Sequence, residues 1–188
     1  QIQKTSTHYM PKSSKQFGQC SICDSNGELS YEDVPPKAAF NRDAFYTATL
    51  DQILSLQDVS SYDANTFNER IGGRKYQGGI GFYTLCHRCN NDTGSWYAAA
   101  FTDWIKQAMT IVLKANGNPT LIYPTSFYPL RVIKQIVTMF FSLNKDSLKH
   151  SQPQLARFVL NKTENHLTGV RIYCYYNVIG SPRYIGFM

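Results

Sequence analysis

Cys20-Ser21-Ile22-Cys23 and Cys86-His87-Arg88-Cys89 are the two stretches that decide the fold. Each is a Cys-x-x-Cys pair, which places two sulfur atoms on one side of a metal ion. Two such pairs supply the four ligands of a tetrahedral zinc site, and four thiolates leave no coordination position open for catalysis. We therefore predict a structural zinc ion that contributes free energy of folding. The alternative is free cysteines buried in the core, but two matched pairs favour the metal.

The size and composition of the chain indicate a folded protein with its own core. It has 188 residues, of which 43% are hydrophobic, enough for one domain or for one domain with an appendage. No apolar run reaches the roughly 18 residues that cross a bilayer, and we find no stretch in this sequence with the basic start and apolar middle of a secretory signal. Five cysteines in such a chain favour metal over disulfides. We expect a cytoplasmic protein without a membrane partner, in which Cys174 is an ordinary core or sheet residue.

The net charge of +6, with a pI near 9.0, favours a polyanionic partner, most often nucleic acid. The candidate phosphate contacts are Arg70, Arg74, Lys75 and Arg88. Three of them lie in or beside the glycine-rich stretch 71–80, which lacks the Gly-Lys-Ser/Thr ending of a phosphate-binding loop. A hairpin-forming loop and a segment contacting the DNA backbone are both open interpretations of that stretch.

Hydrophobic periodicity and turn residues predict the secondary structure. We expect a polar lead-in over 1–19, and strands over Leu29–Val34 and Gly81–Leu85. We expect helices over 50–56, Trp96–Leu113, Pro129–Leu143 and Gln154–Leu160, and a polar link over 145–153. Two further strands are expected at Val170–Ile179 and Tyr184–Met188. Asp92, Thr93 and Ser95 are the candidate N-caps of the first long helix. The apolar end of the chain indicates either a terminal strand or a natural chain that continues.

The residues around the cysteine pairs resemble a known family. Leu29-Ser-Tyr-Glu-Asp-Val-Pro-Pro-Lys37 follows the first pair, and Asn90-Asn-Asp-Thr-Gly-Ser-Trp-Tyr97 follows the second. This arrangement resembles the His-Asn-His (HNH) or ββα-metal endonucleases, above all an uncharacterised bacterial and phage branch. The resemblance covers about residues 20–97, apart from a variable middle, and is vaguer in the later helices.

This resemblance implies an α+β fold. A zinc-braced ββα core, similar to a treble clef, would occupy 20–115, after the lead-in 1–19. Additional helices and a C-terminal antiparallel strand pair would pack on it from 116–188.

The resemblance also implies a second metal site and a set of catalytic residues. By position, Glu32 and Asn90 correspond to the ligands of a divalent cation, Mg²⁺ or Mn²⁺, and Asp33 occupies the place of the histidine that activates water. An aspartate of ordinary pKa is a weak base, although two adjacent carboxylates suit Mg²⁺. His87 is either a replacement base or an exposed knuckle residue. The family's middle asparagine, which braces the loop between the catalytic elements, would be Asn65 or Asn68.

Two functions of different class therefore remain open. The first is a metal-dependent nuclease that cuts DNA phosphodiesters with Glu32, Asp33 and Asn90. The second is a non-catalytic, zinc-braced module that binds nucleic acid or a protein, because the histidine is missing. A purely structural zinc fold within a larger assembly is a third option. Four aromatic residues could stack on bases, but their helical spacing favours core packing: Trp96, Tyr97, Phe101 and Trp104.

Overall fold

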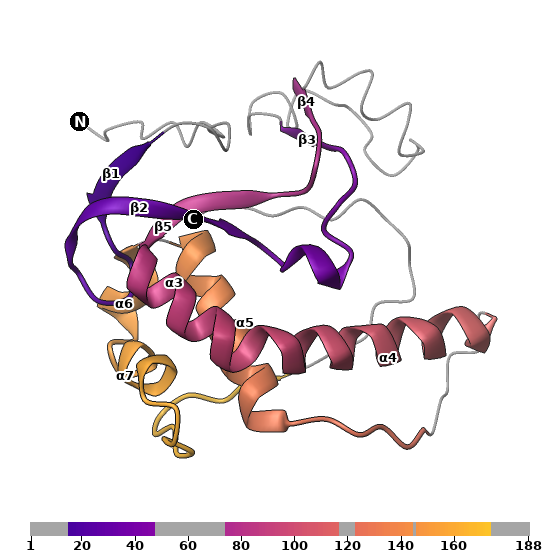
Figure 1. The fold of residues 1–188 in the computed structure, drawn as a ribbon. Coiled ribbons are helices and arrows are strands. Elements are labelled where there is room, and N and C mark those ends of the chain that lie inside the picture. The colour runs from indigo at the N-terminus through magenta and orange to yellow at the C-terminus, as the bar shows by residue number, and fades with distance from the viewer. Residues whose placement is uncertain (1–14, 48–73, 117–122, 145, 174–188) are drawn as a thin grey trace, which may run out of the picture.

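A three-stranded antiparallel sheet forms the strand layer of the protein. The computed structural model describes residues 15–47, 74–116, 123–144 and 146–173 (Figure 1). The sheet has the order β1(Gln16–Gln19), β2(Asn26–Asp33), β5(Gly81–Cys86). A smaller sheet pairs β3(Phe45–Thr47) with β4(Arg74–Tyr76), and a 3₁₀ turn, η1(Lys37–Ala39), lies between β2 and β3. The fold is thus α+β, as predicted.

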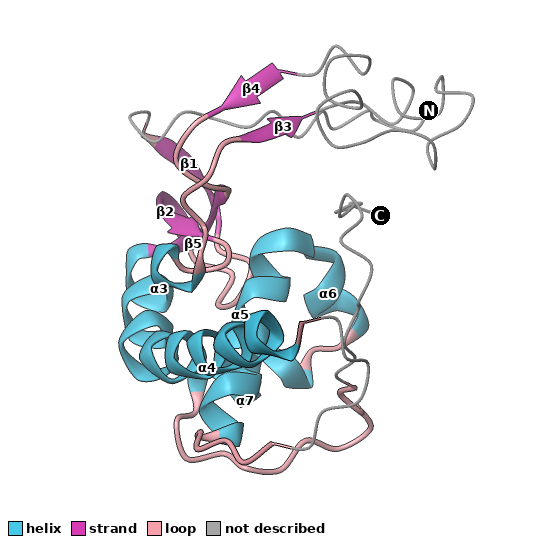
Figure 2. Cartoon of the chain, turned by 90° about the vertical axis from the view of Figure 1, so that its right-hand side faces the viewer, coloured by secondary structure: helices cyan, strands magenta, loops and turns pink. Residues whose placement is uncertain are grey.

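The helices gather on one side of the strands (Figure 2). They are α3(His87–Thr93), the π-helical turn η3(Gly94–Ala98), α4(Ala99–Ala115), α5(Pro129–Asn144), α6(Asp146–Ser151) and α7(Gln154–Leu160). In the ranges that the structure describes, no helix combines the length and the apolar character needed to cross a membrane.

The strands β2 and β5 confirm the two strands predicted near the cysteine pairs. The last four residues of the predicted polar lead-in, in contrast, belong to the sheet. Gln16–Gln19 forms the edge strand β1, paired with Asn26–Leu29 of β2. The side chains of β1 are polar or exposed, and Phe17 is 73% exposed. An edge strand is held by backbone hydrogen bonds, so its side-chain pattern carried little signal. Residues 1–14 lie outside the described residues.

The first long helix begins nine residues earlier than predicted, at His87, and continues through η3 into α4. Its N-cap is Cys86, whose Sγ accepts a hydrogen bond from the Cys89 backbone N–H at 3.5 Å. The predicted caps Asp92, Thr93 and Ser95 all lie inside the helical stretch. A sulfur acceptor replaces the usual side-chain oxygen, and for that reason the capping pattern misplaced the helix start.

The later part of the chain contains both confirmed and corrected elements. Helices α5 and α7 match the predicted ranges within a residue. The supposed link over 145–153 contains helix α6 instead, with Leu148 packed against the main core. Residues Val170–Tyr173 form no strand, and the rest of the expected C-terminal strand pair lies outside the described residues. The expected helix over 50–56 lies outside them too.

One apolar core joins the cysteine pairs to the C-terminal helices. Its buried members are Cys20, Ile22, Leu85, Cys89, Val137, Phe141, Leu155, Ala156, Phe158 and Val159. The Tyr97 hydroxyl, on the π turn, donates to the Val159 carbonyl at 2.9 Å, and burial raises the pKa of Tyr97 to about 12. The expected core role of Tyr97 and Phe101 is confirmed, since both are buried.

A buried lysine closes the end of α7. Lys134 is fully buried, and its ammonium donates to the carbonyls of Asn161 at 2.6 Å and Lys162 at 3.4 Å. The Phe158 ring lies 4.7 Å from the Nζ atom, a favourable cation–π distance. Burial lowers the pKa of Lys134, partly offset by Glu164. The lysine donates to the two carbonyls that directly follow the end of α7, and so ties α5 to α7.

Candidate metal centre and the β2–α3 junction

The first cysteine pair sits in a tight turn between β1 and β2. The Cys20 N–H donates to the Ser25 carbonyl at 2.9 Å, and the Asp24 N–H to the Cys20 carbonyl at 3.0 Å. Asp24 has a left-handed backbone with φ of 62°, which aspartate tolerates better than most residues. The Ser21 N–H donates to the Thr84 carbonyl of β5 at 2.9 Å. The turn is thereby fixed to the strand that leads into the second pair.

The four sulfur atoms have the spacing that zinc requires. The Sγ atoms of Cys20, Cys23, Cys86 and Cys89 all lie within 4.8 Å of one another, and those of Cys23 and Cys86 are 3.7 Å apart. With a Zn–S bond near 2.3 Å, two sulfurs of a tetrahedron are separated by about 3.8 Å. The cysteine pairs therefore fit a tetrahedral zinc ion, as the sequence predicted.

The chemistry of the donors also suits a cation. The hydrogen bond from the Cys89 thiol lowers the pKa of Cys20, while the same contact raises the pKa of Cys89. Four thiols at this distance cannot all ionise without a positive charge among them, and a zinc ion would supply it.

Lys149 of α6 donates to the Ile22 carbonyl at 2.8 Å and to the Asp24 carboxylate. Helix α6 is thus fixed to the turn that holds the first pair.

Asn90 lies on α3 against strand β2. Its Nδ2 donates to the Ser30 hydroxyl at 2.9 Å and to the Tyr31 carbonyl at 3.2 Å. The Ser30 hydroxyl in turn donates to the Leu85 carbonyl of β5 at 3.2 Å. The structure therefore brings Asn90 to the residue just before Glu32. The amide nitrogen of Asn90 joins the helix to the sheet.

The carboxylate of Glu32 is sealed under α5. Glu32 is 7% exposed, and its Oε2 accepts a hydrogen bond from the hydroxyl of Ser142, which is 1% exposed. Burial raises the pKa of Glu32 to about 7, opposed by the Ser142 hydrogen bond and assisted by the charge of Asp33. Sequence reasoning missed Ser142, because it lies 110 positions further along the chain.

Asp33 and His87 lie at the ends of the two elements that meet here, Asp33 at the end of β2 and His87 at the start of α3. Asp33 ends β2, is partly buried and pairs with Gly81 across the sheet. His87 is exposed at the first position of α3. Among the residues described, the four cysteines are the one group of three or more His, Cys, Asp or Glu side chains close enough to share a metal ion.

An asparagine that the sequence analysis did not select braces the loop. Asn41 is buried, and its Nδ2 donates to the carbonyls of Pro35 at 2.7 Å and Ile80 at 2.6 Å. Its Oδ1 accepts from the Ile80 N–H at 2.7 Å. Asn41 thereby joins the two ends of the long segment that connects β2 to β5. Asn65 and Asn68, proposed for this task, lie outside the described residues.

Gly79, near the end of the glycine-rich stretch, serves the same closure. Gly79 has φ of +88°, and a side chain there would overlap the Asn41 carbonyl oxygen. Glycine suits this position for two reasons: it adopts a positive φ without strain, and it has no side chain to meet the Asn41 carbonyl oxygen. The sequence contained one indication of this closure. Asn41 follows the Pro-Pro turn of residues 35–36, and the chain returns through Gly-Gly-Ile at residues 78–80.

Replacement of Asn41 by alanine should lower the free energy of unfolding by about 2 kcal/mol, since the Ile80 N–H and the Pro35 carbonyl lose their partner, while the Ile80 carbonyl keeps its bond to the Val34 N–H. Urea unfolding measures the change. Asn144→Ala is the matched control, because within the described part of the chain the Asn144 side chain is bonded only to the Phe140 carbonyl of its own helix, at 2.9 Å. Equal stability of the Asn41 variant and the parent would contradict the bracing role.

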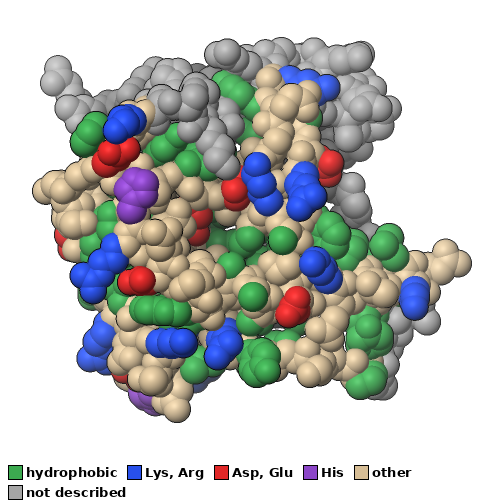
Figure 3. Space-filling model, viewed as in Figure 1, with side chains coloured by type: hydrophobic (Ala, Val, Ile, Leu, Met, Phe, Trp, Pro, Cys, Tyr) green, Lys and Arg blue, Asp and Glu red, His purple; other side chains and the backbone are tan. Residues whose placement is uncertain are grey.

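The basic candidates are dispersed. Lys75 is exposed on β4, and the backbone of Arg74 precedes it in the same strand. Arg88 is exposed on α3, with its Nε 3.8 Å from the Asp92 carboxylate. Arg70 lies outside the described residues. Figure 3 shows Lys and Arg side chains spread over one face of the molecule, interspersed with acidic and uncharged ones.

Comparison with protein-family models, with curated proteins and with solved structures finds no match in any of the three.

Proposed function

We propose that the chain is a zinc-braced, DNA-binding module of the HNH type that does not hydrolyse DNA. The ββα unit, similar to a treble clef, would consist of β2, β5 and α3, with zinc at the four cysteines as its brace. Net charge motivates a DNA partner, and a protein partner is the alternative. The proposal that the chain does not hydrolyse DNA rests chiefly on one observation, the burial of the Glu32 carboxylate against Ser142.

A divalent cation needs carboxylate oxygens that reach it in an ionised state together with bound water. Glu32 is buried, bonded to Ser142, and has its pKa raised to about 7. The Nδ2 of Asn90 donates to Ser30 and Tyr31 of β2, which leaves Oδ1 as the amide atom that a cation would need, so the absence of hydrolysis is inferred from Glu32 and Asp33. Asp33 stands where the resemblance expects a histidine, and a carboxylate is a poor substitute for the neutral imidazole that accepts a proton from water. These residues support the fold in our proposal.

Hydrolysis with Mg²⁺ or Mn²⁺ at Glu32, Asp33 and Asn90 is the second candidate. Two observations favour it, of which the first is the contact of Asn90 with the Tyr31 carbonyl, directly before the two carboxylates. The Asn41 closure also resembles the bracing asparagine of the family. A rotation of Glu32 away from Ser142 would be required for this activity.

We expect no nicking of supercoiled plasmid by the purified chain with Mn²⁺ or Mg²⁺. The matched set is the parent, Glu32→Gln and Asn90→Ala. Nicking by the parent that both variants lose would establish the nuclease instead. Nicking gained by Asp33→His would identify position 33 as the point at which hydrolysis was lost.

DNA binding is tested separately by fluorescence anisotropy with a labelled duplex at several salt concentrations. Binding should weaken steeply with salt, and Lys75→Ala or Arg88→Ala should each reduce the logarithmic slope by about 1. Lys162→Ala, an exposed residue after α7, is the control. Absence of binding at low salt would redirect the proposal to a protein partner.

A further inference from the structure

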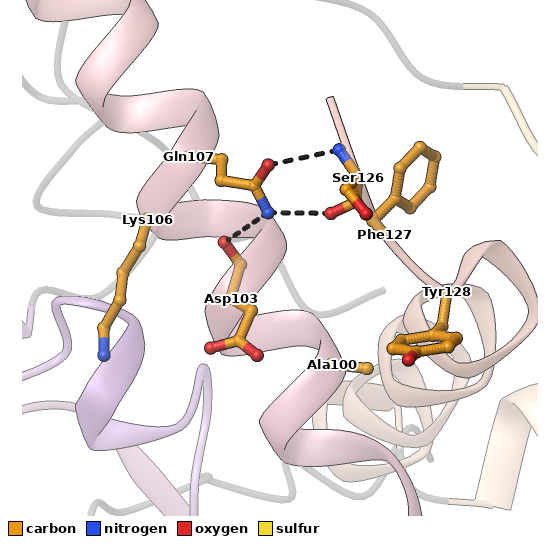
Figure 4. Close-up of a pocket in the computed structure, with 7 residues that line it drawn as sticks. All are labelled: Ala100, Asp103, Lys106, Gln107, Ser126, Phe127 and Tyr128. Carbon is orange, nitrogen blue, oxygen red and sulfur yellow. Dashed lines mark hydrogen bonds between the residues drawn. The ribbon is translucent and has the colours of Figure 1, made fainter. Parts of the chain in front are cut away.

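A cavity between α4 and the segment 123–128 lies outside the junction described above. It has a volume of about 490 Å³ and is lined by Ala100, Asp103, Lys106, Gln107, Ser126, Phe127 and Tyr128 (Figure 4). This volume falls within the range of roughly 300–1,000 Å³ typical of small-ligand sites.

Gln107 holds the two walls of the cavity together. Its Nε2 donates to the Ser126 carbonyl at 2.8 Å, and its Oε1 accepts from the Ser126 N–H at 3.3 Å and from the Thr125 hydroxyl at 3.0 Å. The extended segment is thereby fixed alongside α4 by both ends of one amide (Figure 4). The cavity has a defined shape because its second wall is bonded to the first.

The lining combines exposed aromatic rings with charges of both signs. Tyr128 is 66% exposed and Phe127 is 39% exposed. The guanidinium carbon of Arg131 lies 5.2 Å from the centre of the Tyr128 ring, and the exposed Lys106 lies on the α4 wall. In the described ranges, the Asp103 carboxylate forms no ion pair. Ala100, a small residue, lies beside the Tyr128 ring (Figure 4).

We propose that this cavity binds a base of single-stranded DNA, and that it prefers a base carrying an exocyclic amino group. A base would stack on Tyr128, as bases stack on aromatic side chains in single-strand binding proteins. The Asp103 carboxylate accepts a hydrogen bond from an amino group such as N4 of cytosine, whereas thymine has a carbonyl oxygen at that position, which repels the carboxylate. Arg131 and Lys106 neutralise the flanking phosphates. The proposal rests on the DNA binding proposed above and specifies the form of DNA.

The test is competition between labelled oligo(dC) and oligo(dT) of equal length for the full chain, at neutral pH and low salt. We expect a preference of about tenfold for oligo(dC). Tyr128→Ala should lower the affinity for both strands roughly tenfold. Asp103→Ala should bring the ratio of the two affinities close to one, even though loss of a negative charge strengthens binding to any DNA.

Matched controls separate these effects from general charge and apolar exposure. Glu164→Ala removes a carboxylate elsewhere and should leave the ratio unchanged. Phe17→Ala removes a ring that is 73% exposed on β1 and should leave both affinities unchanged.

Three outcomes would overturn the assignment: equal affinity of the parent for both strands, an unaffected Tyr128→Ala variant, or dCMP binding as tight as oligo(dC). Duplex binding retained in any of these cases leaves the proposed function standing. Absence of binding to every form of DNA removes both proposals.

Discussion

We expect the chain to bind zinc at its four cysteines and to unfold when the zinc is removed. Structural zinc contributes about 10 kcal/mol in small zinc-bound domains, and the stability of a typical domain is about 5–15 kcal/mol in total. Cys20 and Cys89 belong to the main core together with Phe141 and Val159, so loss of the metal exposes the contact between the cysteine pairs and the C-terminal helices. We expect Cys89→Ser to lack zinc and to lose its cooperative thermal transition.

Metal content by mass spectrometry and melting by circular dichroism measure this result. The parent should contain one zinc ion per chain, and a strong chelator should abolish its transition. Cys174→Ser is the matched control, because Cys174 has no partner at ligand spacing in the sequence; it should keep both the zinc and the melting temperature. A parent that is free of zinc and still melts cooperatively would contradict the metal centre.

The cysteine cluster was predictable because its information is local. Each pair lies within four consecutive residues, and only the meeting of the two pairs depends on the fold. Helices α5 and α7 were predictable for a similar reason, since the 3.6-residue period of their apolar side chains directly reflects one buried face. Strand propensity alone was a weaker guide, because Val170–Tyr173 is rich in strand-forming residues and forms no strand.

The features that escaped prediction depend on distant parts of the chain. Asn41 is recognisable as a brace only when residues 79–80 return beside it. The cap of α3 is a sulfur atom whose position is set by the cysteine cluster. Glu32 was placed by its motif as an open metal ligand. Its burial comes from Ser142 on α5, in a region where the resemblance to nucleases is vague.

Replacement of Glu32 by glutamine should therefore stabilise the fold at neutral and alkaline pH. The pKa of Glu32 is raised from 4.5 to about 7 in the folded chain, so the folded state binds the proton more tightly than the unfolded state. The associated stability is complete below pH 4.5 and is lost as the pH rises to about 7. Glutamine is uncharged throughout and its amide oxygen still accepts from Ser142. The variant should exceed the parent by about 2 kcal/mol near pH 6 and about 3 kcal/mol near pH 8.

Urea unfolding of the zinc-loaded chain between these two pH values measures the difference. Asp92→Asn is the control, since the Asp92 carboxylate is partly exposed beside Arg88 and should give a small difference that does not grow with pH. The same experiment with added Mn²⁺ distinguishes the two proposed functions. A cation bound by ionised Glu32 would stabilise the parent and reverse the order of the two proteins. If Glu32 only supports the fold, Mn²⁺ leaves the advantage of glutamine unchanged, because a sealed carboxylate offers the ion no ligand.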